Sequence, residues 1–226
     1  MHIGILQCGH FPTAEGFQPQ TYGELYEAFL SGRGLTFQTW PVVDMEFPDS
    51  ITAADGWLIT GSKHGAYEDL PFIAPLEQFL RDAYAADVPI VGICFGHQIL
   101  AQALGGHVAK FSDGWALGRQ SYDFGGQSVA LNAWHQDQVI DPPEEATTIG
   151  TNPFCQHAAL AYKGRAFSVQ GHPEFSDSHV ELLLNVRRAA LTEAQADEVR
   201  RNLGQPLSND TLADQIAAFF KEPAHV

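Results

Sequence analysis

The chain has 226 residues, of which 45% are hydrophobic and 17% charged, so we predict a single globular domain over residues 1–226. Its formal net charge of −15 repels nucleic acid and anionic membranes, and we expect neither as a partner. Three scattered cysteines without a CxxC pair exclude a disulfide framework and a cysteine-based zinc site. The N-terminus has no signal-peptide pattern, so we expect a cytoplasmic protein with reduced thiols.

Strand and helix patterns alternate through the first half of the chain. Apolar runs bounded by turn residues indicate strands, and apolar residues at helical spacing indicate amphipathic helices. The expected strands are residues 2–8, 36–42, 56–60 and 89–93, and the expected helices are residues 21–30, 71–86 and 97–104. This alternation predicts an α/β fold with an open, mostly parallel twisted sheet and helices on both faces.

The second half divides into a strand-rich middle and a helical end. Residues 107–170 contain several short strand patterns, which we expect to form small antiparallel strands beside the sheet. Residues 177–221 are helical in pattern. Chemistry in open α/β sheets gathers at the carboxyl ends of the strands, where Gly61-Ser62, Cys94 and His172 are expected to lie.

The sharpest local signal is Gly92-Ile93-Cys94-Phe95-Gly96, between an expected strand and an expected helix. The two glycines suit a turn too tight for side chains, and the helix N-terminus favours a thiolate at Cys94. The N–H of Phe95 then points toward an oxyanion formed beside the sulfur. A buried structural cysteine and a cysteine-type α/β-hydrolase, such as a dienelactone hydrolase, remain alternatives for this motif taken alone.

A candidate base and its orienting carboxylate follow in Gln170-Gly171-His172-Pro173-Glu174. A cysteine nucleophile needs a base that takes its proton and returns it to the leaving amine, and the base needs a carboxylate partner. Two residues apart in an extended chain, His172 and Glu174 would leave the same face. Each residue alone has a bland reading, His172 as a loop histidine and Glu174 as a carboxylate at a helix start. The two together, downstream of the cysteine motif, favour catalysis.

Four segments resemble motifs of the class I glutamine amidotransferases and follow one another in the order found in that family. Along the chain they are ITGS (residues 59–62), PIVGICFGHQILAQALGG, AWHQDQV (residues 133–139) and QGHPE. The resemblance covers residues 1–190 and leans toward stand-alone members similar to the GMP synthase glutaminase, a branch that plant γ-glutamyl peptidases also resemble. It implies a flavodoxin-like fold, with C-terminal helices over residues 177–221.

The resemblance also implies a mechanism. Cys94, His172 and Glu174 form a catalytic triad, and Gly61, Ser62 and Phe95 supply the oxyanion hole. Gln98, Trp134 and His135 bind glutamine, although Trp134 stands where many members have serine. Glutamine is hydrolysed to glutamate and ammonia through a thioester, with no cofactor and no metal, and the ammonia passes to a synthetase or acceptor subunit on another chain.

Two other functions fit the same residues. An independent γ-glutamyl peptidase or hydrolase would use the same three catalytic side chains on larger γ-glutamyl amides, and a wide pocket mouth would favour it. A regulatory subunit would hold an idle glutaminase until a partner docks. Cys155, close to His157 in sequence, is the one competing nucleophile.

Overall fold

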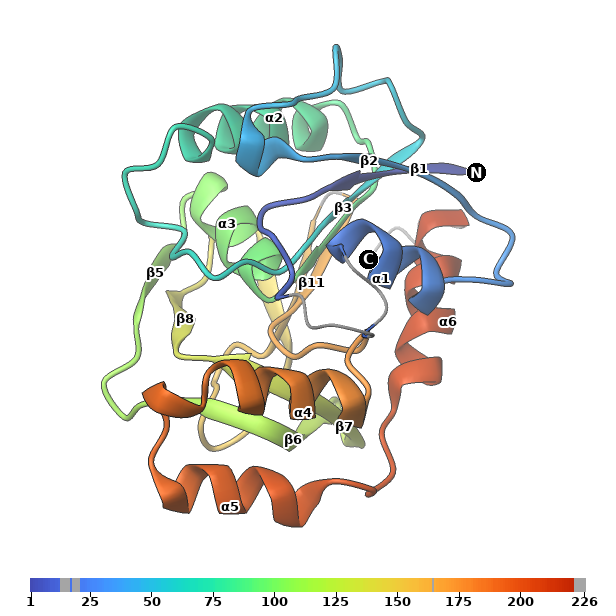
Figure 1. Cartoon of the computed structure of the whole chain (residues 1–226). Helices are drawn as coiled ribbons and strands as arrows, with labels where there is room; N and C mark the ends of the chain where they lie inside the picture. Colours follow the sequence, from blue (N-terminus) through green and yellow to red (C-terminus); the bar gives the residue numbers. More distant parts are fainter. Residues whose placement is uncertain (13–16, 18–20, 164, 222–226) are drawn as a thin grey trace.

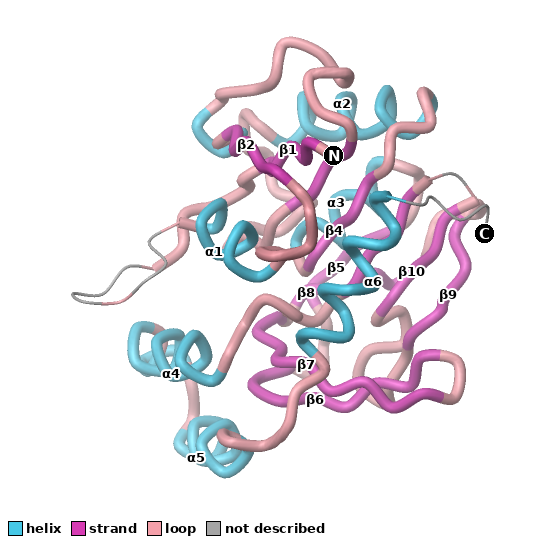
Figure 2. Tube along the Cα trace, turned by 90° about the vertical axis from the view of Figure 1, so that its right-hand side faces the viewer, coloured by secondary structure: helices cyan, strands magenta, loops and turns pink. Residues whose placement is uncertain are grey.

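A seven-stranded sheet forms the centre of the molecule, in the order β2-β1-β3-β4-β11-β10-β9 (Figures 1 and 2). The structure, a computed structural model, describes residues 1–12, 17, 21–163 and 165–221. The strands are β1 (His2–Leu6), β2 (Thr36–Trp40), β3 (Gly56–Ile59), β4 (Ile90–Ile93), β9 (Ala146–Gly150), β10 (Ala159–Tyr162) and β11 (Ala166–Val169). Neighbours from β2 to β11 are parallel, whereas β10 runs antiparallel to β11 and β9.

Helices cover both faces of this sheet because successive strand side chains point to opposite sides. On β3, Leu58 packs in one core with residues of α1 and α6, whereas Trp57 and Ile59 pack in the other with residues of α2 and α3. The helices are α1 (Tyr22–Phe29), α2 (Ile73–Ala85), α3 (Phe95–Ala103), α4 (Asp177–Val186), α5 (Glu193–Asn202) and α6 (Asn209–Lys221), with 3-10 turns η1 (Val42–Asp44) and η2 (Arg188–Ala190).

Two small antiparallel pairs lie beside the main sheet. β5 (His107–Lys110) pairs with β8 (Asp137–Asp141), and β6 (Ala116–Phe124) forms a hairpin with β7 (Gln127–His135). Helices α4 and α5 lie alongside this hairpin (Figure 1), where a small apolar cluster joins Leu117 to Val180 and Val199. The sequence patterns missed β8, and the helical pattern after residue 180 ends at Val186 before the separate turn η2.

The predicted fold class is confirmed, including the antiparallel side strands. Strands β3, β4 and β11 are adjacent in the sheet, so the segments that follow them meet at one edge. Helix α3 begins at Phe95, two residues before the predicted start at residue 97, and the chain therefore turns directly from Cys94 into the helix. Within the described part of the chain, no helix is long and apolar enough to cross a bilayer.

Candidate active site

Cys94 occupies a strained turn between β4 and α3. Its φ of 54° and ψ of −104° are unusual for a residue with a side chain, and such a conformation costs about 1–3 kcal/mol. The turn is fixed on both sides, because Cys94 N–H donates to the Val169 carbonyl at 2.9 Å and the Cys94 carbonyl accepts from Gln98 N–H at 3.1 Å. Cys94 is buried, with 4% of the residue exposed.

Glycine is required on both sides of this turn. A Cβ atom on Gly92 would lie 2.4 Å from the Gly96 carbonyl oxygen. A Cβ atom on Gly96 would lie 2.3 Å from the carbonyl oxygen of Ile59 on β3. Both distances are below any real contact, so the glycines let α3 pack directly against the ends of β3 and β4.

His172 and Glu174 lie in a tight turn just beyond β11. His172 N–H donates to the Asn132 carbonyl at 2.7 Å, which ties the turn to β7, and Phe175 N–H donates to the His172 carbonyl at 3.2 Å. The imidazole Nδ1 lies 2.6 Å from Glu174 Oε1. The extended chain expected from the sequence is wrong: a turn, and not strand alternation, brings the two side chains together.

The electrostatics of His172 favour its protonated form. Burial lowers the pKa of the imidazole, but the charges of Cys94 and Glu174 and the hydrogen bonds to both side chains outweigh it, so the pKa is raised above its ordinary value. The ring contacts both the Cys94 sulfur and the Glu174 carboxylate. An imidazolium in this place stabilises a neighbouring thiolate.

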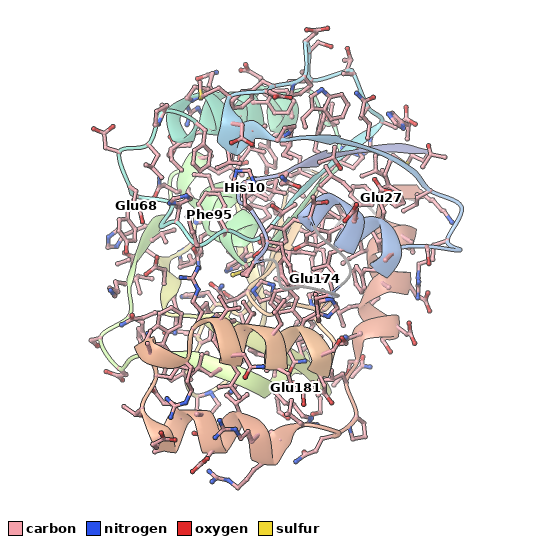
Figure 3. All side chains as sticks on the ribbon, viewed as in Figure 1. His10, Glu27, Glu68, Phe95, Glu174 and Glu181 are labelled. Atoms are coloured by element: carbon pink, nitrogen blue, oxygen red, sulfur yellow. The ribbon has the colours of Figure 1, made fainter. Side chains whose placement is uncertain are left out.

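Two side chains that the sequence reading missed hold this arrangement. The hydroxyl of Tyr26, on α1, donates to Glu174 Oε1 at 2.8 Å, and burial raises the pKa of this phenol well above its ordinary value. Phe175 stacks on the His172 ring with centroids 4.0 Å apart and planes 1° from parallel. Figure 3 shows Glu174 among the inner side chains. Tyr26 lies in the helix predicted over residues 21–30, and its apolar spacing there indicates no polar role.

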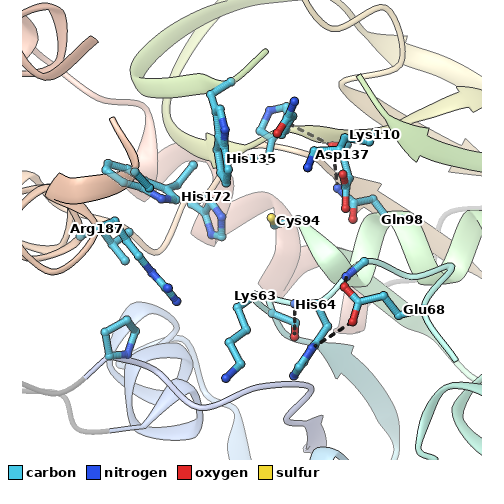
Figure 4. A pocket seen from close by; sticks show the side chains of 18 of the residues that line it. Lys63, His64, Glu68, Cys94, Gln98, Lys110, His135, Asp137, His172 and Arg187 are labelled. Atoms are coloured by element: carbon cyan, nitrogen blue, oxygen red, sulfur yellow. Dashed lines mark hydrogen bonds and ion pairs between the residues drawn. The ribbon is translucent and has the colours of Figure 1, made fainter. Parts of the chain in front are cut away.

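A cavity of about 380 Å³ opens over Cys94 (Figure 4). Of the residues predicted to bind substrate, Gln98, Trp134 and His135 all line it. The Gln98 amide donates to the Asp137 carbonyl at 2.8 Å and to Gln170 Oε1 at 3.2 Å, which fixes its orientation. Burial, with a contribution from the charge of His172, lowers the pKa of His135 to about 3, so this ring is neutral.

The residues predicted to form an oxyanion hole come from two segments, the start of α3 and the loop after β3. Phe95 is the first residue of α3, and its N–H is among those that have no partner within the helix. Gly61, in the loop after β3, lies against the His172 ring: a Cβ atom on Gly61 would lie 3.1 Å from the ring carbon Cε1. Ser62, the next residue, lines the cavity.

The other two cysteines do not line this cavity. Burial raises the pKa of the Cys8 thiol above its ordinary range and that of Cys155 to about 12. The His157 ring bonds the Thr148 hydroxyl at 2.7 Å. Cys155 is therefore a poor nucleophile despite its neighbour in sequence. Among the described residues, no group of three His, Cys, Asp or Glu side chains is placed to hold a metal ion.

Comparison with known proteins identifies the family. The sequence model of the glutamine amidotransferase class-I family matches residues 33–184. The chain belongs to this family. A glutamine amidotransferase-like protein of Schizosaccharomyces pombe is 34% identical over 177 residues, which are 73% of this chain and 71% of the relative. Gamma-glutamyl peptidase 3 of Arabidopsis thaliana is 31% identical over 180 residues, which are 71% and 72% of the two chains.

The fold also matches a solved member of the glutamine amidotransferases. A crystal structure of a glutamine amidotransferase from Thermotoga maritima superposes with a TM-score of 0.78 and covers 98% of this chain and 96% of that chain. At 20% sequence identity this likeness concerns the fold. Family and fold, both expected from the four sequence segments, are thus confirmed.

Proposed function

We propose that the protein hydrolyses γ-glutamyl amide bonds, glutamine among them, through a thioester on Cys94. One observation carries the proposal: a cysteine held at a strained helix start shares a cavity with a buried imidazole bound to a carboxylate. Cys94 is the nucleophile, His172 the acid and base, and Glu174 the group that orients the imidazole.

The proposed reaction proceeds in two halves. The Cys94 thiolate attacks the γ-carbonyl carbon, and N–H groups of Phe95 and of Gly61 or Ser62 hold the oxyanion, each worth about 3 kcal/mol of barrier. The imidazolium of His172 protonates the leaving nitrogen, and the carbon–nitrogen bond breaks. His172 then takes a proton from water, which attacks the thioester and releases glutamate and the Cys94 thiolate.

The acyl half of the substrate extends toward Gln98, Trp134 and His135, which line one part of the cavity. The leaving amine distinguishes amidotransfer from peptidase activity. With ammonia as the leaving group, a synthetase or acceptor subunit would receive it. A cavity of about 380 Å³ has room for a ligand larger than glutamine, and the Arabidopsis relative carries the name of a γ-glutamyl peptidase. Both observations favour larger γ-glutamyl amides.

A substrate panel tests the proposal. Purified protein is incubated with glutamine, γ-glutamylalanine and γ-glutamylethylamide, and glutamate release is measured. We expect release from at least one compound, loss of that activity in Cys94→Ala, and a near wild-type rate in Cys155→Ala. A Cys94→Ala variant with the wild-type rate contradicts the assignment.

Labelling with a diazo-ketone analogue of glutamine adds a second measurement. Mass spectrometry should find the label on Cys94 and not on Cys8 or Cys155. Strong labelling of the isolated protein supports an independent hydrolase. Weak labelling that rises when a synthetase is added supports partner-dependent amidotransfer. Stoichiometric labelling of Cys94→Ala overturns the nucleophile.

A further inference from the structure

Two positively charged side chains line the cavity without a carboxylate partner among the described residues. The chain has 12 Lys and Arg against 27 Asp and Glu, yet Lys63, Lys110 and Arg187 all line this one cavity. Lys110 lies near the Asp137 carboxyl. Burial raises the pKa of this carboxyl, and the charge of Lys110 acts in the opposite direction. Lys63 and Arg187 are in no ion pair within the described parts of the chain.

Arg187 is set apart by its place in the cavity, because Arg119, Arg165 and Arg201 are also in no ion pair among the described residues but do not line it. The remaining arginines are paired. The Arg33 guanidinium lies 2.8 Å from Asp214, and that of Arg200 lies 2.9 Å from Asp197. Arg188, directly after Arg187, pairs with Glu193. In a protein this acidic, cations left free in a cavity indicate that an anion from outside binds there.

The two cations lie on one side of the nucleophile. In Figure 4, Cys94 stands between Lys63 and Arg187 on one side and Gln98 and Asp137 on the other. The C–N bond of a γ-glutamyl amide is planar and trans, so its acyl chain and its amine substituent extend in opposite directions. With the glutamyl half toward Gln98, the leaving half extends toward Lys63 and Arg187.

Arg187 also faces the reacting centre. Burial raises the pKa of Tyr22, whereas the charge of Arg187 lowers it, so the guanidinium acts on this phenol. The Tyr22 hydroxyl lies 3.4 Å from the position of a Cβ atom on Gly61, beside His172. Leu183 and Leu191 line the same cavity and supply an apolar wall for the body of a leaving group.

We propose that Lys63 and Arg187 bind a carboxylate on the leaving amine, so that the substrates are γ-glutamyl amino acids or peptides with a free carboxylate. The inference rests on the proposed function and narrows its substrate class. The planar guanidinium of Arg187 can donate two parallel hydrogen bonds to a carboxylate, and Lys63 adds a point charge. Glutamine and γ-glutamylamines lack this group and are the poorer substrates.

The test compares two substrates that differ only in the charge of the leaving group. Glutamate release is measured as kcat/KM on γ-glutamylalanine and on γ-glutamylalaninamide. For the wild type we expect a preference of about tenfold or more for the carboxylate, the size of one charge-assisted hydrogen bond. Arg187→Gln and Lys63→Gln should each lower this ratio severalfold. Raising the salt concentration should lower it in the wild type, because both cations are exposed.

Arg188→Gln is the matched control. It removes the same charge one residue away, from a side chain that pairs with Glu193 and does not line the cavity, and it should keep the wild-type ratio. Equal rates of the wild type on both substrates, or an unchanged ratio in both Arg187→Gln and Lys63→Gln, overturn the carboxylate site. No glutamate from any γ-glutamyl compound would instead overturn the proposed function, since that result does not depend on the leaving group.

Discussion

Replacing Glu174 by glutamine tests how the carboxylate acts on the imidazole. Oε1 of Glu174 accepts from the Tyr26 hydroxyl at 2.8 Å and lies 2.6 Å from His172 Nδ1. The other carboxylate oxygen is buried without a partner among the described residues. In Glu174→Gln the amide oxygen can keep both contacts of Oε1, and the NH2 group then takes the place of the unpartnered oxygen. The shape is kept and the charge is lost.

Two effects of this substitution can be sized. A hydrogen bond to a charged group contributes about 1.5–3 kcal/mol, and one pKa unit corresponds to about 1.4 kcal/mol. Loss of the charge should therefore lower the pKa of His172 by about one to two units and lower kcat/KM about tenfold to a hundredfold. An unpartnered group occupies the second position in both proteins, so the loss of about 1–3 kcal/mol in the free energy of unfolding comes from the two hydrogen bonds of Oε1, which lose their charge.

The direction of the pH effect follows from the raised pKa of His172. Above its pKa the imidazolium loses the proton that the leaving amine needs, so activity declines on the alkaline side. Because Glu174→Gln lowers this pKa, the alkaline limb should move to lower pH. The pH dependence of kcat/KM for glutamate release measures it.

Glu181→Gln serves as the control for this experiment. Glu181 is exposed on α4 (Figure 3), and its substitution should leave both the rate and the pH profile unchanged. If Glu174→Gln keeps the wild-type rate and the same alkaline limb, the carboxylate does not act on His172 during the reaction.

Two further predictions concern stability. Gly96→Ala should lower the free energy of unfolding by about 3 kcal/mol, since its Cβ atom would collide with the Ile59 carbonyl. Gly125→Ala, which meets nothing within 4 Å, should cost only about 1 kcal/mol, and equal costs in urea unfolding would contradict the collision. Burial, together with the charge of His135, lowers the pKa of His97 from 6.5 to about 3. Below about pH 6.5 the His97 imidazole is protonated in the unfolded chain, but in the native state it stays neutral down to about pH 3. The free energy of unfolding therefore decreases as the pH is lowered through this range. Between about pH 7 and pH 5, the free energy of unfolding of His97→Gln should therefore decrease by about 2 kcal/mol less than that of the wild type. An equal decrease in both proteins would contradict the lowered pKa of His97.

The location of the site could be predicted from the sequence because apolar runs mark the strands and the residues with chemical function directly follow those runs. Apolar runs mark β3, β4 and β11, and the residues after them carry Gly61, Cys94 and His172. Local patterns do not state that β11 lies beside β4, since this pairing joins segments far apart in the chain. The order of motifs shared with the family supplied that information. A single domain over residues 1–226 stays a prediction.

The sequence missed what tertiary packing decides. Tyr26 reaches Glu174 only because α1 packs on the sheet face whose core also contains Val169 of β11, and its place in an apolar helix face predicts nothing more than burial. Arg187 follows α4 and lies within residues 177–221, where the sequence pattern predicts helix and gives no sign that a helix ends at Val186. Whether a charged residue faces solvent or a cavity depends on where its helix ends.

The two halves of the site rest on different parts of the fold, and this difference decides how each responds to substitution. Three contacts fix the backbone conformation of Cys94. They are its hydrogen bond to β11, the close packing of Gly96 on β3 and the start of α3. A change there alters stability and reactivity together. Lys63 lies in the loop after β3 and Arg187 at the end of α4, and both side chains are exposed. Their substitution removes charge without disturbing the core, so the choice of leaving group can change while the chemistry at Cys94 is retained.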